Sequence, residues 1–368
     1  MINQPEILVI GGGIIGLSIA IELKLRGANV HLVDQHLAGW ATPAAAGMLA
    51  PQAEQIEPGV MLDLCCASRE IYPDYVSKLE HITGANTGYW PCGILAPVYQ
   101  SDHQSNHQVI NNYWLNQDAI QQKQPGLGTE VQGGYWYPLD GQVDNRLLCQ
   151  SLQRAIAHLH IPIHHTLVKN IVFDGEEIAY LATDQGELRA EHYVLATGSW
   201  SEQLLSIPVF PTKGQMLSVL LPEIQIDQPD WQSQVIDNLP LQQVLFGESS
   251  YIVPRKNGRI VIGATTEKVG FAPGNTGGGM QTLLNNAIRL FPLIKDCQIE
   301  EFWWGFRPDT PDQLPILGTS AYNNLTLATG HYRNGILLGP ITAQLIADLV
   351  WDNKSHPLLA SFHYSRFS

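Results

Sequence analysis

The chain has 368 residues, which suits two domains with sizeable cores better than one. Hydrophobic residues make up 45% and charged residues 15% of the sequence, a composition typical of soluble globular proteins. Asp and Glu total 34 against 20 Lys and Arg, and no basic run is visible, so the formal charge of −14 argues against nucleic acid as a partner.

Several further classes are disfavoured. The first apolar run follows the N-terminus without a positively charged region, and no apolar stretch approaches the roughly 20 residues of a membrane span, so we expect no secretory signal and no membrane segment. The 5 cysteines form no C-x-x-C pair, and the 13 histidines show no ligand spacing. We therefore expect a cytoplasmic protein with free thiols and no metal site.

The strongest motif lies at residues 7–34. Residues 7–10 form a short apolar run typical of a buried strand, and Gly11, Gly13 and Gly16 then complete a G-x-G-x-x-G frame. Apolar residues at helical spacing predict a helix at residues 14–26. This order of strand, glycine loop and helix predicts a dinucleotide site, because bare glycines let the backbone approach a pyrophosphate at the helix N-terminus.

A second apolar run, at residues 30–33, predicts another strand that ends at Asp34. A carboxylate at this distance from the glycine loop accepts hydrogen bonds from an adenosine ribose and repels a 2′-phosphate. The motif therefore predicts FAD or NAD rather than NADP.

Residues 40–52 read W-A-T-P-A-A-A-G-M-L-A-P-Q. Loops exposed to water rarely gather so many small apolar residues, so contact with a large aromatic ligand is favoured over an ordinary surface loop. Further along, apolar spacing predicts helices at residues 61–79 and 145–160, and the polar residues 103–124 suggest a pair of surface helices.

The second half of the chain is richer in predicted strands. Alternating patterns predict strands at residues 161–173 and 177–183, a buried strand ending at Thr197 and Gly198, a strand pair at residues 209–220, and a hairpin formed by residues 250–255 and 259–266. A helix is predicted at residues 280–290, and an aromatic strand at residues 300–308 carries a single charge, Arg307.

The tail predicts a strand ending at Gly330, a loop at residues 331–335 and a helix that begins near Gly339 and Pro340, because proline is favoured in a first turn. Pieces suited to nucleotide binding thus lie at the start, middle and end of the chain. The second domain must be inserted between them.

Five motifs together resemble the glycine oxidase family of FAD-dependent amine oxidoreductases, which is related to the D-amino-acid and sarcosine oxidases: G-G-G-I-I-G with Asp34, A-A-A-G-M-L-A, Y-I-V-P-R, W-G-F-R-P and G-H-Y-R-N-G-I-L-L-G-P. The resemblance spans nearly the whole chain. It implies an α/β fold with a discontinuous Rossmann-like FAD-binding domain at residues 1–76, 142–208 and 318–368. A mixed β-sheet substrate domain with helices is then expected at residues 77–141 and 209–317.

The resemblance implies three catalytic residues, Arg307, Tyr251 and Arg333. Arg307 would grip the substrate carboxylate, since a guanidinium binds a carboxylate in a bidentate manner; the alternative is pairing with Asp309 or Asp312. Tyr251 would add a hydrogen bond to the carboxylate, although a core tyrosine is the ordinary interpretation of such a strand residue. Arg333 would lie near substrate and flavin, or simply cap its loop.

Substrate-pocket positions implied by the resemblance are Met48 and Thr266. The family often places a larger apolar residue where Thr266 stands, so substrate size and preference stay open. No cysteine occurs at residues 303–306, where some relatives attach the flavin, so we expect non-covalent FAD. The expected cofactor contacts are Gly11, Gly13, Ile14, Ile15, Gly16, Asp34, Gln35, Thr42, Ala46, Gly47, Met48, Leu49, Val168, Thr197, Gly198, Gly330, His331, Tyr332, Arg333, Asn334, Gly335, Ile336 and Leu337.

The implied activity is oxidation of glycine, with sarcosine, D-alanine and D-proline as further substrates, by hydride transfer to flavin and reoxidation by O2 to hydrogen peroxide. The imine would feed thiamine thiazole synthesis, with functional coupling to thiazole synthase, and a homo-oligomer is allowed. Two alternatives remain: a dehydrogenase of the same fold that uses a quinone or protein acceptor, and an FAD-binding protein without turnover.

Overall fold

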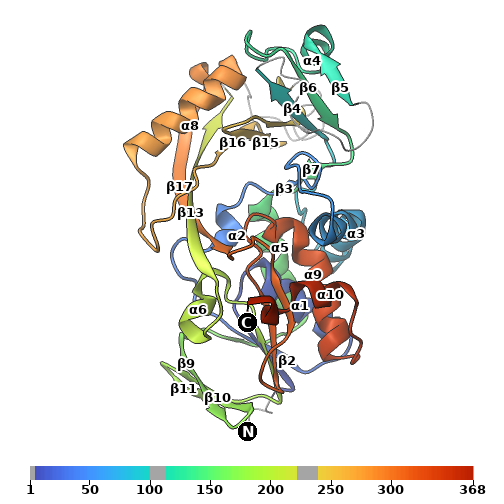
Figure 1. The fold of residues 1–368 in the computed structure, drawn as a ribbon, viewed down its shortest axis with the longest axis vertical. Helices are drawn as coiled ribbons and strands as arrows, with labels where there is room; N and C mark the ends of the chain where they lie inside the picture. Colours follow the sequence, from blue (N-terminus) through green and yellow to red (C-terminus); the bar gives the residue numbers. More distant parts are fainter. Residues whose placement is uncertain (1–4, 100–112, 222–238, 368) are drawn as a thin grey trace.

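The structure is a computed structural model that describes residues 5–99, 113–221 and 239–367 (Figure 1). Its elements form two main sheets at opposite ends of the molecule, with helices packed on each. The six-stranded sheet contains, in spatial order, β18 (Ile316–Thr319), β19 (Leu325–Thr329), β12 (His192–Leu195), β1 (Ile7–Ile10), β2 (Val30–Val33) and β8 (Ile163–His164). All neighbouring pairs are parallel except β18 with β19.

Both faces of the six-stranded sheet are covered, which explains the continuous apolar run of β1. Ile7 and Val9 pack into a core shared with helices, whereas Leu8 and Ile10 pack toward a small antiparallel sheet. The helices are α1 (Ile14–Leu25), α3 (Val60–Thr83), α5 (Asn145–His158), α9 (Gly335–Val350) and α10 (Leu358–Phe362). The small sheet contains β9 (Val168–Asp174), β10 (Glu177–Thr183) and β11 (Gly186–Leu188).

The second main sheet has eight strands. In spatial order these are β17 (Gln298–Asp309), β13 (Phe210–Leu220), β16 (Arg259–Gly263), β15 (Tyr251–Pro254), β14 (Val244–Phe246), β4 (Ile94–Val98), β6 (Gly133–Tyr137) and β5 (Trp114–Asn116). One face packs on α8 (Gly277–Leu290) and α4 (Gln117–Lys123). The other face carries Met216, Val253 and Val261 and faces the N-terminal segment.

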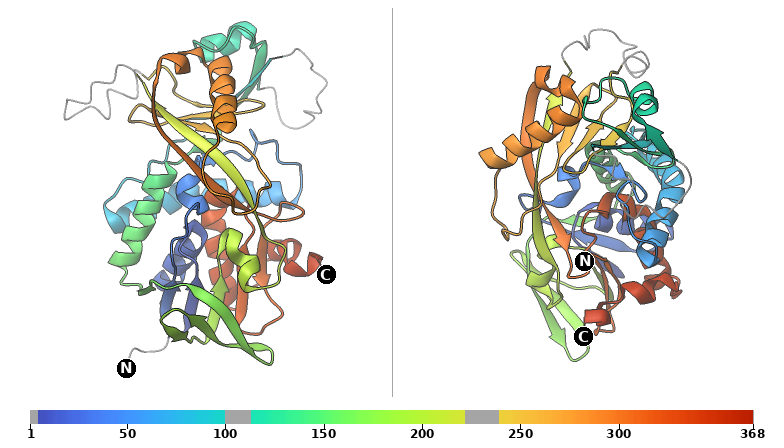
Figure 2. Two further views of the ribbon diagram at one scale, coloured as in Figure 1. Left: turned by 90° about the vertical axis from the view of Figure 1, so that its left-hand side faces the viewer. Right: turned by 45° about the horizontal axis from the view of Figure 1, so that its top comes forward.

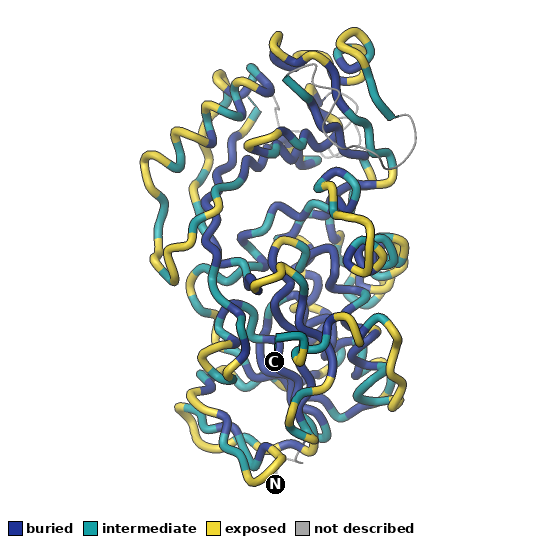
Figure 3. The backbone as a smooth tube through the Cα atoms, in the orientation of Figure 1, coloured by how far each residue is buried: buried dark blue, intermediate teal, exposed yellow. Residues whose placement is uncertain are grey.

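Short elements complete the fold. They are α2 (Ala41–Ala44), β3 (Met48–Leu49) paired with β7 (Gly141–Gln142), α6 (Ser201–Leu204), and 3-10 turns at Gly198–Trp200, Pro292–Asp296 and Tyr364–Phe367. Figure 2 shows the long strands β13 and β17 running from the eight-stranded sheet toward the six-stranded one. Figure 3 shows that the central strands of both sheets are buried, while exposed residues occur on the outer sides of helices such as α8 and in the connecting loops.

The structure confirms the mixed α/β fold and corrects the sequence-based elements at three places. Residues 210–220 form one continuous strand, not a strand pair, because Gly214 pairs with Gly305 of β17 without interrupting the ladder. Residues 114–123 form a strand and a short helix instead of a helix pair; residues 103–112 lie outside the described residues. The domain limits stay a prediction.

The third correction concerns α9, which begins at Gly335 and not near Pro340. Proline inside a helix cannot donate to the carbonyl four residues earlier, here that of Ile336. The hydroxyl of Tyr72 on α3 donates to this carbonyl at 3.1 Å. A buried partner from another helix thus satisfies the backbone group that Pro340 leaves free, and the helix continues through the proline.

Candidate active site

A large pocket lies between the two main sheets, with about 1780 Å³ of empty space including its opening to solvent. The β1–α1 loop, residues 33–37 and the segment around Thr42 to Met48 line one part of it. Strands β13, β15 and β17 and the β19–α9 loop line the other part. The chain therefore brings residues from its start, middle and end to one pocket, as the motifs predicted.

The glycines of the G-x-G-x-x-G motif differ in what a side chain at each position would meet. A Cβ atom on Gly11 would lie 2.4 Å from the carbonyl oxygen of Ala196, and one on Gly16 would lie 1.9 Å from the carbonyl oxygen of Gly11. A Cβ on Gly13 would meet only the Thr42 hydroxyl, at 3.4 Å. Gly11 and Gly16 thus serve close packing of strand and helix, while Gly13 leaves the pocket side of the loop open.

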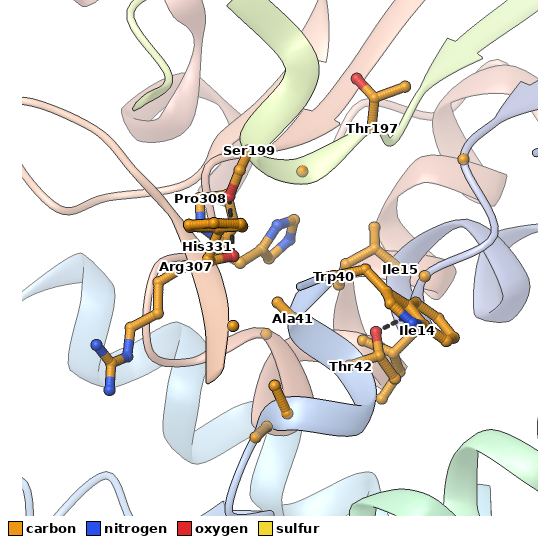
Figure 4. Close-up of a pocket in the computed structure, with 18 of the residues that line it drawn as sticks. Ile14, Ile15, Trp40, Ala41, Thr42, Thr197, Ser199, Arg307, Pro308 and His331 are labelled. Carbon is orange, nitrogen blue, oxygen red and sulfur yellow. Dashed lines mark hydrogen bonds between the residues drawn. The ribbon is translucent and has the colours of Figure 1, made fainter. Parts of the chain in front are cut away.

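The N-terminus of α1 faces the pocket at Ile14 and Ile15, and its first turn contains only apolar residues and Gly16. The Thr42 hydroxyl oxygen accepts the Ile14 N–H at 2.9 Å (Figure 4). The partial positive charge of this helix end favours an anion in the pocket. In proteins with the G-x-G-x-x-G motif, the pyrophosphate of the dinucleotide binds at this helix N-terminus.

Asp34 lies at the end of β2 beside this loop. Its Oδ1 atom accepts the Gly12 N–H at 2.8 Å, which fixes the carboxylate. Its Oδ2 atom is buried without a hydrogen bond among the described residues, although Nδ1 of His36 lies 2.6 Å away. A pocket-lining carboxylate beside an imidazole can accept a ribose hydroxyl, so this end of the pocket suits the predicted dinucleotide.

A second helix N-terminus reaches the pocket from the opposite end of the chain, at Gly335 and Ile336 of α9. Beside it lies His331, whose Nε2 is 3.1 Å from the Thr342 hydroxyl. Burial lowers the pKa of His331 to about 3, so its imidazole is neutral at neutral pH. The pocket therefore holds the positive ends of two helices, which suits a cofactor with negative charge at two places.

The segment from Thr42 to Met48 is held by Arg255, which follows β15 and is 4% exposed. Its Nη2 atom donates to the Ala46 carbonyl at 2.8 Å and to Asn145 Oδ1 at 3.1 Å. Asn145 in turn donates to the carbonyl oxygen of Thr42 at 3.0 Å. The segment is therefore fixed by two buried side chains that the sequence analysis did not select.

Arg307 projects from β17, and Figure 4 shows it pointing away from Ser199 and His331. Its Nη1 atom donates to the Thr265 carbonyl at 3.1 Å. The two acids that could have neutralised it have other partners: Asp309 accepts from Thr212, and Asp312 pairs with Arg366 at 2.7 Å. Within the described part of the chain Arg307 forms no ion pair, so neither Asp309 nor Asp312 neutralises it.

Two glycines make room for the predicted carboxylate-binding groups. A Cβ on Gly214 of β13 would lie 2.5 Å from Nη2 of Arg307, and a Cβ on Gly263 of β16 would lie 2.6 Å from the Tyr251 hydroxyl. Burial raises the pKa of Tyr251, against the opposing effect of Arg307, so its hydroxyl stays protonated and can donate. An arginine and a tyrosine donor thus lie in the same part of the pocket.

Arg333 lies in the β19–α9 loop and donates to the Thr266 hydroxyl at 3.3 Å. Thr266 itself is exposed and does not line the pocket. It can therefore influence the site through Arg333, which does line it, rather than through direct contact with a ligand.

Glu54 also lines this part of the pocket, in the turn before α3, and the sequence analysis missed it. Burial raises the pKa of its carboxyl group to about 7, while Arg333 and Arg307 oppose the shift. No motif marks this residue. Only the folded chain brings it near the two arginines.

Most of the other predicted site residues line the pocket, and a few do not. Those that line it are Gly11, Gly13, Ile14, Ile15, Asp34, Gln35, Thr42, Ala46, Gly47, Met48, Val168, Thr197, Gly198, Tyr251, Arg307, His331, Tyr332, Arg333, Gly335 and Ile336. Outside the lining are Gly16, Leu49, Thr266, Gly330, Asn334 and Leu337. Leu49 and Leu337 belong to the helix-side core of the six-stranded sheet, and Asn334 immediately precedes α9.

Known proteins resemble the chain over nearly its whole length. The glycine oxidase of Bacillus subtilis is 31% identical over 366 residues, which cover 96% of this chain and 95% of that protein. The bifunctional protein ThiO/ThiG of Trichormus variabilis is 53% identical over 369 residues, 98% of this chain. The chain covers 55% of that protein and so spans about half its length.

Solved structures agree in fold. The crystal structure of glycine oxidase from Geobacillus kaustophilus superposes with a TM-score of 0.89, at 31% identity, over 99% of each chain. Within the described residues, no helix is both long and apolar enough to cross a membrane. The family model described as FAD dependent oxidoreductase matches residues 6–349, and the chain therefore belongs to the FAD-dependent oxidoreductase family.

Proposed function

We propose that this protein oxidises glycine and other small amines or D-amino acids, such as sarcosine, D-alanine and D-proline, with FAD as a non-covalent cofactor and dioxygen as acceptor. One observation carries the proposal: the Arg307 guanidinium, which forms no ion pair with a described residue, lies beside the protonated Tyr251 hydroxyl. Both groups line the same pocket as the α1 N-terminus and Asp34, which suit a dinucleotide. For a primary amine such as glycine the overall change is amino acid, water and O2 to α-keto acid, ammonia and H2O2, whereas sarcosine would release methylamine in place of ammonia and D-proline would give a cyclic imine.

The substrate carboxylate is bound by Arg307 and Tyr251. A planar guanidinium donates two parallel hydrogen bonds to a carboxylate, and the tyrosine hydroxyl adds a third donor. These contacts fix the α-carbon, and such positioning supplies a large part of the rate enhancement in a reaction that needs no strong acid or base. Arg333, held by Thr266, adds positive charge at the same end of the pocket.

Substrate size is limited by the residues around this carboxylate site. Met48, Met216 and Phe246 line the pocket beside Tyr251. These side chains leave an apolar space for a small α-substituent and exclude water from the α-carbon. We infer a preference for glycine and for amino acids with short side chains.

The cofactor would be held by the elements that fit it. The α1 N-terminus and Thr42 would bind the pyrophosphate, Asp34 would accept from the ribose, and residues 331–333 with the α9 N-terminus would hold the ring system. Bound FAD supplies a two-electron acceptor for the hydride of the α-carbon and returns these electrons to dioxygen. The helix end and the neutral His331 stabilise negative charge that develops next to them.

The product and its partners follow from the same proposal. The imino acid hydrolyses in water or passes to a thiazole synthase in thiamine biosynthesis, a coupling supported by relatives named ThiO/ThiG. We also propose a cytoplasmic location. No helix among the described residues is long and apolar enough to cross a membrane. A homo-oligomer remains a proposal that sedimentation would test.

The test uses the purified yellow protein. Glycine, sarcosine, D-alanine and D-proline are added separately without air, and flavin absorbance is followed; air is then admitted and peroxide is measured. Bleaching by glycine that reverses with stoichiometric peroxide supports the oxidase. Bleaching that persists in air would favour a dehydrogenase with another acceptor. No bleaching by any of the four would refute oxidation of small amino acids.

A further inference from the structure

We propose that Glu54 receives the substrate amine, so that the pocket recognises a zwitterion by opposite charges at its two ends. Arg307 binds the carboxylate and Glu54 accepts a hydrogen bond from the ammonium group, which passes one proton to this carboxylate or to water before hydride transfer, because only the neutral amine can form the imine as the hydride leaves. This inference rests on the proposed function and extends it, since it names the group that distinguishes an amino acid from a simple carboxylic acid.

The turn that carries Glu54 is held firmly. Its own N–H donates to the Ala50 carbonyl at 3.0 Å, and the preceding Ala53 N–H donates to Oδ2 of Asp140 at 2.8 Å. Asp140 is fully buried and pairs with Arg69 at 2.5 Å. Because the backbone is fixed by a buried ion pair, the Glu54 side chain starts from a defined place at the pocket wall.

Glu54 lies near two arginines but forms no ion pair with a described residue, so its carboxylate is available to a ligand. Arg307 and Arg333 are near enough to attract its carboxylate, yet none of the ion pairs between described residues includes Glu54. The carboxylate and the guanidinium groups therefore line one pocket without contact between them. A molecule that carries a negative and a positive charge on neighbouring atoms satisfies both sides at once.

The titration of Glu54 follows from its surroundings. Burial raises its pKa to about 7, Arg333 and Arg307 lower it, and Asp140 raises it. The remaining titratable groups near it are Tyr251 of β15 and Cys65 of α3, both of which have raised pKa values and stay neutral. A bound ammonium group favours the ionised carboxylate, so recognition of an amine strengthens as pH rises through about 7.

A matched pair of unreactive ligands isolates this contact. 2-Aminoisobutyrate and pivalate have the same carboxylate and nearly the same shape, and differ in an ammonium group against a methyl group. Neither has an α-hydrogen, so neither can lose a hydride. Each is titrated into the full FAD-containing chain at pH 8, and the change in the flavin spectrum gives the dissociation constant.

The unsubstituted protein is expected to prefer 2-aminoisobutyrate by about tenfold or more, the range of a hydrogen bond between charged groups. Glu54→Gln should reduce the ratio to near one and leave pivalate binding within about threefold. The preference should also fall from pH 8 to pH 6 in the unsubstituted protein and stay flat in Glu54→Gln. Glu57→Gln, at an exposed position in the same segment, is the control and should keep the ratio.

If the methyl groups prevent binding of both ligands, glycine and propionate replace them, with the glycine constant taken from anaerobic flavin reduction. An unchanged ratio in Glu54→Gln would overturn the inference, as would an equal loss of both ligands, which indicates a structural role. Should glycine reduce the flavin while the ratio is unchanged, only the role of Glu54 fails. Should glycine not reduce the flavin at all, the proposed function fails.

Discussion

Gly214→Ala tests whether Arg307 acts from the position that the structure shows. The new Cβ would lie 2.5 Å from Nη2 of Arg307, and an ordinary contact needs about 3.5 Å, so the guanidinium must move by about 1 Å. Gly214 is not among the glycines with positive φ, so alanine fits its backbone. The free energy of unfolding should therefore change little, because the end of a flexible side chain can shift.

Activity should respond more strongly than stability. A misplacement of about 1 Å at a positioning group costs about 100-fold, which corresponds to about 2.7 kcal/mol of transition-state stabilisation. We expect kcat/KM for glycine to fall by about this factor while FAD content stays unchanged. The assay is peroxide release at several glycine concentrations, with urea denaturation as the measure of stability.

Gly278→Ala is the matched control. Gly278 lies in the first turn of α8, where an added Cβ meets nothing within 4 Å. This variant should keep full activity. If Gly214→Ala retains kcat/KM within about threefold, the substrate carboxylate does not depend on this position of Arg307, and the assignment is refuted.

Three further predictions concern binding and stability. Arg307→Ala should retain FAD but lose saturation by glycine, with kcat/KM lower by about 100-fold or more, whereas exposed Arg189→Ala should not. Tyr72→Phe leaves the Ile336 carbonyl without its donor and should lower the free energy of unfolding by about 1–3 kcal/mol in urea titration; an unchanged value would show that the hydroxyl is dispensable. Burial lowers the pKa of His192 from 6.5 to about 4, so the folded state favours neutral imidazole and stability is lost as pH falls below about 6.5. Between pH 7 and 5 this loss is about 2 kcal/mol, and His192→Gln should lose correspondingly less, as equilibrium denaturation at both pH values would show.

The N-terminal unit was predictable because its signals are local. The strand at residues 7–10, the helix after the glycines and the strand that ends at Asp34 all occur where their patterns place them. Each depends on neighbours within about 20 residues. The family motifs in addition predicted that the C-terminal segment, Arg307 and Arg333 belong to the site. The same local logic predicted the hairpin formed by β15 and β16.

Local patterns failed where a distant partner decides the outcome. Gly214 resembled a turn, yet pairing with Gly305 on one side keeps the strand continuous. Pro340 resembled a helix start, yet the Tyr72 hydroxyl from α3 satisfies the carbonyl that the proline leaves free. In both cases the local preference amounts to about a few kcal/mol or less, and tertiary contacts outweigh it.

The sequence by itself determined the cofactor class, the order of the nucleotide-binding elements and the residue types suited to a carboxylate. Only the tertiary structure decided which charges are neutralised: Asp309 and Asp312 have other partners, and Arg307 forms no ion pair with any residue that the structure describes. It also brought Glu54 into the same pocket, and it held the Ala46 segment with Arg255. Charge pairing and burial depend on distances between residues far apart in the chain, and such distances exist only once both sheets have packed around the pocket.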